Sequence, residues 1–275
     1  MSIKLLVKFA SKSFTLPDTC VRLREALDNP KADLDDVGRI IAVDPSLSAK
    51  VLRLANSALF RFPAQIETIP KALNVIGGEA AYNISIAETA NIAFKKFAHD
   101  DLDFDVFWEN AVMTGLIAKS IAQQKQMRGS DRFFAIGVIQ SLSELLAALK
   151  LPEKYTAYRA NGQLRVPIHT QEEVFKFSFP NCTGEVLAEW QLPQSLVLPL
   201  QSIDAAPRAE LGLDEAVVYV ALAMQFAQQH NIAFEHLKHF NASTTELLNL
   251  SDDEYEMILN FAKLETTKIA QMINN

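Results

Sequence analysis

Residues 133–149 are apolar on nearly every side of a helix. A helix with this pattern has no face for water and belongs in the middle of a helical bundle. Four polar residues interrupt it: Gln140, Ser141, Ser143 and Glu144. Buried polar groups need partners, so this segment is where a bundle would place a site. The alternative is that the four residues face a solvent window or bond to neighbouring loops.

Helical periodicity also runs through the rest of the chain. Residues 44–60 place apolar side chains at three- and four-residue steps, as in a helix that packs one face against a core. Asp44 and Pro45 suit the cap and first turn of that helix, and Ser251 with Glu254 forms a capping-box pattern before the last helix. Ala, Leu, Glu, Lys and Gln dominate, so we predict an all-α protein of roughly a dozen helices.

Composition and charge exclude several classes of protein. Apolar residues make up 49% of the 275 residues, which is enough for a large core and excludes wholesale disorder. No apolar run reaches the length of a membrane span. The net charge of −7 argues against a protein that grips nucleic acid over its whole surface. Cys20 and Cys182 are isolated, as expected of reduced thiols in a cytoplasmic protein.

Two segments suggest how the chain is divided. The N-terminus carries Lys4, Lys8 and Lys12 at four-residue steps among apolar residues, so it can form a basic amphipathic helix. Three lysines make a weak membrane anchor, and we expect this segment to pack on the body of the protein. The acidic residues 98–105 are the clearest candidate for a hinge between two halves.

Two stretches of sequence carry a family resemblance: "IIAVDPSLSAKVLRLANSALF" at residues 40–60 and "IETIPKALNVIGG" at residues 66–78. They resemble the HDOD family, bacterial signalling modules related to the HD-domain metal-dependent phosphohydrolases. The resemblance runs from about Leu16 to about Ile203 and is weaker in the second half, where it rests on stretches such as "FWENAVMTG". It implies an all-α, HD-related multi-helix bundle in two lobes.

With this resemblance the chain divides into three parts. We predict a basic amphipathic segment at 1–15, an HDOD-like domain at 16–212 with lobes at about 16–98 and 104–212, and C-terminal helices at 213–275 packed on the domain.

The same resemblance shows where the chain departs from its catalytic relatives. In those relatives a His on the "FWENA" helix and a His-Asp pair in the next helix hold metal, with further His positions downstream. The resemblance implies that the corresponding residues here are Asn110, Gln140, Ser141, Asn181, Gln201 and Ser202. All are neutral, and amides and hydroxyls are poor ligands for divalent metals. We therefore predict a vestigial site with no metal, no cofactor and no catalytic residue.

Three of these residues should still form a cluster. If the family's arrangement is kept, Asn110, Gln140 and Ser141 lie close together and bond to one another or to trapped water. In that case Gln140→Leu leaves partners unsatisfied and costs about 1–3 kcal/mol.

The polar face of the helix in residues 44–60 has two readings. Arg53, Asn56 and Ser57 lie there and could form a docking surface with the loop that follows. We favour the alternative, in which Asn56 and Ser57 bond to loop backbone groups. Arg53 is kept as a possible partner contact because interfaces are enriched in Arg.

The resulting prediction is a non-enzymatic, cytoplasmic output or scaffold module of bacterial signal transduction that acts through contacts with other signalling proteins. One alternative is a catalytically inactive sensor of a nucleotide or cyclic dinucleotide in the vestigial cleft, and another is a metal-dependent HD-type phosphohydrolase. We expect no nucleic-acid partner and no membrane span, and the oligomeric state stays open.

Overall fold

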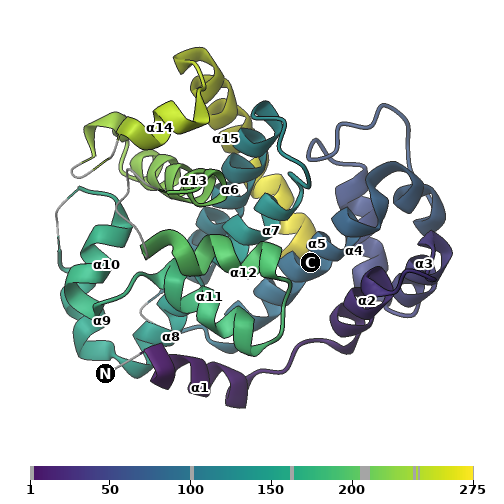
Figure 1. Cartoon of the computed structure of the whole chain (residues 1–275), viewed down its shortest axis with the longest axis horizontal. Coiled ribbons are helices and arrows are strands. Elements are labelled where there is room, and N and C mark those ends of the chain that lie inside the picture. The colour runs from purple at the N-terminus through teal and green to yellow at the C-terminus, as the bar shows by residue number, and fades with distance from the viewer. Residues whose placement is uncertain are drawn as a thin grey trace.

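The computed structural model describes residues 3–99, 102–161, 164–204, 211–237, 240 and 242–274. This part of the chain is a bundle of helices and contains no β-strand, which confirms the predicted all-α class (Figure 1). Its α-helices are α1 (Ile3–Ser13), α2 (Asp18–Asp28), α3 (Leu34–Ala42), α4 (Pro45–Ala55), α5 (Ile69–Lys96), α6 (Phe104–Gln124), α7 (Arg132–Ile139), α8 (Leu142–Lys150), α9 (Pro152–Arg159), α10 (Pro167–Phe175), α11 (Phe179–Glu189), α12 (Gln194–Gln201), α13 (Leu213–Gln229), α14 (Ala242–Leu248) and α15 (Asp252–Asn274). Two short 3₁₀ helices are η1 (Ser202–Asp204) and η3 (Phe234–His236).

The two predicted helix caps, at Asp44 and at Ser251, are confirmed. The Asp44 carboxylate accepts a hydrogen bond from Leu47 N at 3.0 Å, with Pro45 in the first turn of α4. Before α15, Ser251 N donates to the Glu254 carboxylate at 2.7 Å and Glu254 N donates to Ser251 Oγ at 3.3 Å. These bonds satisfy backbone donors that have no partner inside the helix.

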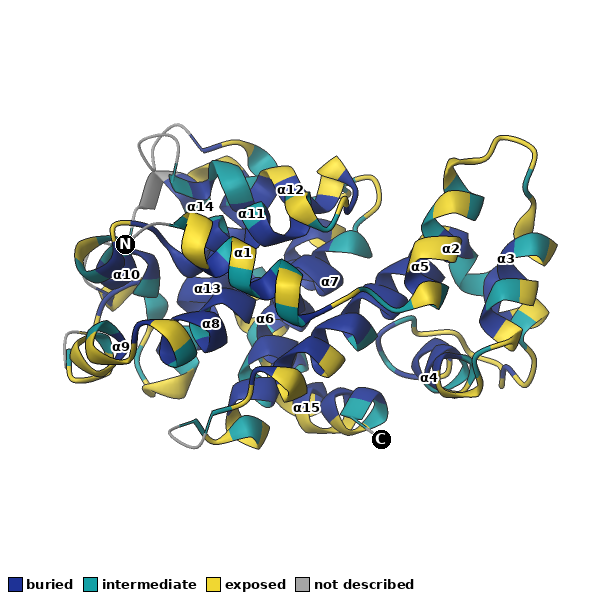
Figure 2. Ribbon diagram, turned by 90° about the horizontal axis from the view of Figure 1, so that it is seen from below, coloured by how far each residue is buried: buried dark blue, intermediate teal, exposed yellow. Residues whose placement is uncertain are grey.

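The long helix α5 connects two groups of helices. It packs against α2, α3 and α4, which lie together at one side of the molecule, and also against α7, α8 and α15 (Figure 2). Gly77 adopts φ 82° and ψ 163°, which are not helical, so α5 is kinked at this glycine. The division into lobes at 16–98 and 104–212 stays a prediction, and part of its proposed hinge, residues 100–101, lies outside the described residues.

The N-terminal helix α1 packs on α8 and α11, which are far from it in the sequence. Leu6 and Ala10 are buried in that contact, while Lys4, Lys8 and Lys12 are exposed. The segment therefore uses its apolar stripe on the protein's own core.

Helices α6 and α7 form the centre of the bundle, and α13 and α15 cover α6. The indole of Trp108 in α6 donates to Ala270 O of α15 at 3.0 Å, which fixes α15 against α6. Within the described residues, one stretch, Arg132–Lys150, is long and apolar enough to cross a membrane by length and composition. It is 78% buried inside the protein, as a core segment should be.

Candidate functional site

The candidate site begins where α6 crosses α7. A Cβ atom added to Gly137 would lie 2.6 Å from Gly115 Cα, and one added to Gly115 would lie 2.6 Å from Phe134 O. Only glycine permits so close an approach of the two backbones. Asn110 lies five residues before Gly115 in α6, and Gln140 directly follows Ile139, the last residue of α7.

The predicted continuous helix through residues 133–149 is wrong. Helix α7 ends at Ile139 and α8 starts at Leu142, with a turn at Gln140 and Ser141 between them. Thr183 of α11 holds this turn, since its hydroxyl donates to Gln140 O at 2.9 Å and accepts from Ser143 N at 3.1 Å. These bonds satisfy backbone groups that a continuous helix would have paired internally.

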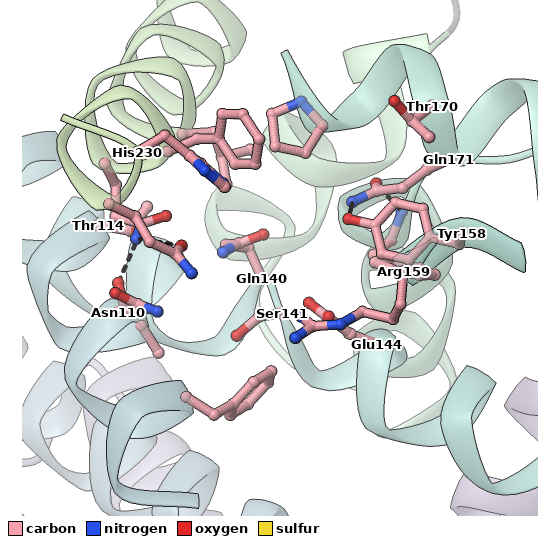
Figure 3. Close-up of a pocket in the computed structure, with 18 of the residues that line it drawn as sticks. Asn110, Thr114, Gln140, Ser141, Glu144, Tyr158, Arg159, Thr170, Gln171 and His230 are labelled. Atoms are coloured by element: carbon pink, nitrogen blue, oxygen red, sulfur yellow. Dashed lines mark hydrogen bonds between the residues drawn. The ribbon is translucent and has the colours of Figure 1, made fainter. Parts of the chain in front are cut away.

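The turn opens onto a cavity of about 500 Å³. Figure 3 shows amide, hydroxyl and charged side chains from α6, α8, α9, α10 and α13 that surround the Gln140–Ser141 turn. The polar residues that line it are Asp103, Asn110, Thr114, Gln140, Ser141, Glu144, Tyr158, Arg159, Asn161, Arg165, Thr170, Gln171, Gln225, Gln229 and His230. Phe107, Phe179 and Phe226 contribute aromatic surface to the same walls.

The structure thus brings Asn110, Gln140 and Ser141 into the lining of one cavity. The predicted direct bonds among them are absent from the described structure. The backbone carbonyl of Asn110 accepts a hydrogen bond from Thr114 Oγ1 at 2.9 Å. The hydroxyl oxygen of Ser141 is buried with no partner among the described residues. Gln140 is only 5% exposed, yet no hydrogen bond of its side-chain amide is found in the described part of the chain. The side-chain amide of Gln140 and the hydroxyl of Ser141 are therefore available for hydrogen bonds to a molecule inside the cavity.

The other three vestigial positions form a separate group that does not line this cavity. Asn181 Nδ2 donates to Gln201 O at 2.7 Å, and Gln201 Nε2 donates to Glu185 Oε1 at 3.0 Å. Ser202 follows directly in η1. These residues join α11 to α12, so they serve the packing of that pair and do not complete a ligand set with Asn110 and its neighbours.

The polar face of α4 is used inside the protein. Asn56 Nδ2 donates to Ile66 O at 2.7 Å and its Oδ1 accepts from Ile66 N at 2.8 Å, which pins the loop before α5. Ser57 Oγ donates to Leu54 O at 2.6 Å. The intramolecular reading fits Asn56 and Ser57. Arg53 keeps a buried Nε without a partner among the described residues, and its role as a partner contact stays a prediction.

Several residues of the cavity were not singled out from the sequence. Gln171 is 5% exposed, accepts from Phe179 N at 2.8 Å and donates to the Tyr158 hydroxyl at 3.4 Å. Arg165 donates to Thr170 Oγ1 at 2.7 Å and to Glu173 at 2.6 Å. Gln171 stands in the short helix α10 and Arg165 just before it, in sequence that carries no motif. Only the packing of α9 and α10 against α8 and α11 brings them to the site.

Glu144 of α8 is a carboxylate beside the Gln140–Ser141 turn. It accepts a hydrogen bond from the Tyr155 hydroxyl at 3.0 Å. Burial raises the pKa of Glu144, and the Tyr155 bond and the charge of Arg159 lower it only in part. The site therefore favours the neutral carboxylic acid more than water does.

The residues at the vestigial positions do not fit a divalent metal. Asn110, Gln140 and Ser141 offer only neutral amide and hydroxyl oxygens, whereas Zn²⁺, Mn²⁺ and iron sites use imidazole, thiolate or carboxylate donors. Among the described residues, no three His, Cys, Asp or Glu side chains are grouped so that they could hold a metal ion.

Comparison with known proteins decides the family. The family model for the HDOD domain matches residues 14–205, most of the chain. The chain belongs to the HDOD family. The resemblance predicted from residues 40–78 is thereby confirmed, over nearly the predicted extent. In sequence, this HDOD chain is 23% identical over 220 residues to an uncharacterised protein of Treponema pallidum (strain Nichols), and it spans 42% of that relative's length.

Solved structures with the same fold cover nearly the whole HDOD chain. An HDOD domain protein from Geobacter sulfurreducens superposes with a TM-score of 0.70 at 18% identity, covering 99% of this chain and 97% of that one. A protein from Shewanella amazonensis SB2B, named as a candidate phosphohydrolase, gives 0.70 at 19% identity, with 98% and 97% covered. A protein from Marinobacter aquaeolei VT8, named as a candidate signal transduction protein, gives 0.68 at 16% identity, with 96% and 60% covered. The TM-scores show a shared fold.

Proposed function

We propose that this HDOD protein is a non-enzymatic output or scaffold module of bacterial signal transduction, which acts in the cytoplasm through contacts with other signalling proteins. Membership of the HDOD family supports a signalling role, and the Marinobacter protein of the same fold carries a signal-transduction name. A fold alone does not assign a reaction, so the site has to decide between scaffold and enzyme.

The observation that carries the proposal is the donor set around the cavity. The resemblance implies that Asn110, Gln140 and Ser141 stand where the catalytic relatives hold metal, and these three residues line one cavity together. These three positions supply no imidazole or carboxylate ligand for a metal that would lower the pKa of water. Phosphohydrolase chemistry of the HD type therefore has no support from these residues.

A hydrolysis assay separates scaffold from enzyme. Purified protein is incubated with Mn²⁺, Fe²⁺ or Mg²⁺ and with nucleotides, cyclic dinucleotides and an aryl phosphate, beside a Gln140→Ala variant. We expect equal, background rates for both proteins. Metal-dependent turnover that Gln140→Ala removes would contradict the non-enzymatic proposal and favour the phosphohydrolase alternative.

The scaffold role needs a direct partner. Crosslinking in the source cell, followed by mass spectrometry and reconstitution from purified proteins, should give a binary complex with another signalling protein. Arg53→Ala tests whether the α4 surface takes part, with Arg22→Gln on α2 as a matched surface control. A reconstituted complex that forms only with metabolic or structural proteins would contradict a signalling role.

A second candidate function has an observation of its own in its favour. The cavity of about 500 Å³ lies within the size range of small-molecule sites, and its amide and hydroxyl groups are positioned for hydrogen bonds. A catalytically inactive sensor, which binds a small ligand in the vestigial cleft and passes the binding event to a partner, fits this cavity. It is compatible with the scaffold role, since it adds an input to the same output module.

A further inference from the structure

The walls of the cavity are held in place before any ligand arrives. Gln171 is fixed by Phe179 N at 2.8 Å, and Arg165 is fixed by Thr170 at 2.7 Å and by Glu173. Thr114, 1% exposed, bonds to its own helix. Side chains held in this way lose little freedom on binding, which is what a ligand site needs.

Most charged groups at the cavity already have partners. The Asp103 carboxylate caps α6 by accepting from Asp105 N at 3.1 Å and from Val106 N at 3.2 Å. Arg165 is paired with Glu173. Glu144 accepts from Tyr155. None of these groups has its charge fully available to a ligand.

Arg159 is different. It lies in the last turn of α9, and Figure 3 shows its side chain extending into the cavity toward Ser141 and Glu144. Its side chain is exposed and, within the described residues, makes no hydrogen bond and no ion pair closer than 4.0 Å. The carboxyl group of Glu144, which Figure 3 shows near Arg159, is shifted toward the neutral acid by burial. The guanidinium therefore gives the cavity a positive, solvent-exposed group that is not bonded to a carboxylate among the described residues.

The other residues that line the cavity are suited to bind the uncharged part of an organic molecule. The amides of Asn110 and Gln140 and the hydroxyl of Ser141 supply hydrogen-bond donors and acceptors. Phe226 and His230, whose ring centroids are 4.3 Å apart with the rings tilted by 47°, supply aromatic surface on the α13 side. A bare inorganic ion would leave these groups and most of the volume unused.

From these observations we infer that the cavity binds a small organic anion, with Arg159 contacting its phosphate or carboxylate group and the Asn110, Gln140 and Ser141 cluster contacting its uncharged part. The inference rests on the sensor form of the proposed function and names its ligand class. Guanidinium groups bind both phosphate and carboxylate with paired hydrogen bonds, so the chemistry is common to the two sources.

Calorimetric titration with two matched pairs of probes distinguishes these sources. Adenosine 5′-monophosphate against adenosine tests an organic phosphate, and hippurate against its neutral amide tests an organic carboxylate. We expect saturable binding of at least one anion, with its neutral analogue at least about tenfold weaker, a difference of about 1.4 kcal/mol.

Variants then place the binding at the cavity. Arg159→Gln should weaken the bound anion about tenfold or more while leaving its neutral analogue unchanged, and Arg159→Lys should restore part of the loss. Gln140→Leu should weaken both members of the pair. Arg22→Gln, on the exposed face of α2, should change nothing. Thermal unfolding of each variant checks that the fold is kept.

The outcomes separate this inference from the proposed function. If neither anion shows saturable binding, or if Arg159→Gln binds as tightly as the parent protein, the inference is wrong and the non-enzymatic proposal stands. If the bound phosphate is hydrolysed in a metal-dependent reaction, the non-enzymatic proposal is wrong while the anion site stands.

Discussion

Gly115 of α6 and Gly137 of α7 are in direct backbone contact, with room for no side-chain atom between them. Near this crossing, Asn110 of α6 and Gln140, which directly follows α7, lie beside the same cavity. The geometry of the vestigial site therefore depends on two residues that have no side chain and no role in binding.

A Cβ at this crossing should destabilise the protein. Gly137→Ala would place its methyl group 2.6 Å from Gly115 Cα and 2.8 Å from Thr114 O, so the two helices must separate. We expect a loss of about 1–3 kcal/mol in the free energy of unfolding, measured with urea. Gly38→Ala in α3 is the matched control, because its Cβ would meet Leu73 only at an ordinary 3.4 Å. That variant should lose nothing and can gain up to about 1 kcal/mol from helix propensity. Equal losses for the two variants would contradict the packing described at the α6–α7 crossing.

The turn between α7 and α8 should depend on Thr183. Its side chain is fully buried and bonds to Gln140 O and Ser143 N, so Thr183→Val keeps the shape and leaves both groups unsatisfied. The expected cost is about 1–3 kcal/mol by urea unfolding. Thr156→Val, on the exposed surface of α9, should stay within about 0.5 kcal/mol of the parent protein.

Gln140→Leu should change the stability less than the sequence alone predicts. The Gln140 side chain has no hydrogen-bond partner among the described residues, so its removal leaves no protein group unsatisfied. We now expect a change in stability within about 0.5 kcal/mol, measured in the same urea series. A loss of several times that size would show that its amide is bonded in the folded protein.

Glu144 should give stability a measurable pH dependence. Its pKa is raised in the folded protein, mainly by burial, above the value of about 4.3 for an unfolded chain. Such a group stabilises the fold most below its unfolded pKa, and that contribution is lost as the pH rises through the folded pKa. Glu144→Gln should therefore be more stable than the parent protein near pH 7, and this advantage should shrink toward pH 4. Parallel urea titrations across that range measure the difference, and an advantage that grows on acidification would contradict the assigned shift.

The buried ammonium of Lys119 should make Asp131 important. Lys119 Nζ lies 2.7 Å from the Asp131 carboxylate and donates to Leu59 O at 3.0 Å, so it ties the loop after α4 to α6. Burial lowers the pKa of Lys119, and Asp131 opposes that shift. Asp131→Asn leaves a buried charge without its partner and should cost about 3 kcal/mol. The double variant Lys119→Met/Asp131→Asn should cost less than Asp131→Asn alone, as measured by thermal or urea unfolding. A double variant that is less stable than Asp131→Asn would show that the ion pair itself matters less than the stem of Lys119.

The sequence predicts this fold well where the signals are local. Asp44 and Ser251 start helices because their side chains cap them, and this chemistry is visible in three or four residues. The break at Gln140 is not predictable in this way. Residues 133–149 read as one helix, and the turn is held by Thr183, some forty residues further along the chain. Long-range packing of that kind has no local signature.

The candidate site divides along the same line. The resemblance located Asn110, Gln140 and Ser141 because they occupy positions of a known pattern. Arg159 and Gln171 come from short helices without a motif, and their place in the cavity follows only from how α9 and α10 pack. Asn181 and Gln201 were assigned to the same site by analogy, but they bond to each other's helices elsewhere.

Metal binding by the purified protein tests the central claim most directly. The parent protein and an Asn110→His/Gln140→His/Ser141→Asp variant, which restores the imidazole and carboxylate donors of the catalytic relatives, are titrated with Mn²⁺ and Fe²⁺, dialysed and analysed for metal. We predict that the parent chain retains well below about 0.1 metal ion per chain, because neutral amides and hydroxyls cannot hold a divalent ion against water. About one or two ions retained per parent chain, lost on Gln140→Ala, would contradict a non-enzymatic module.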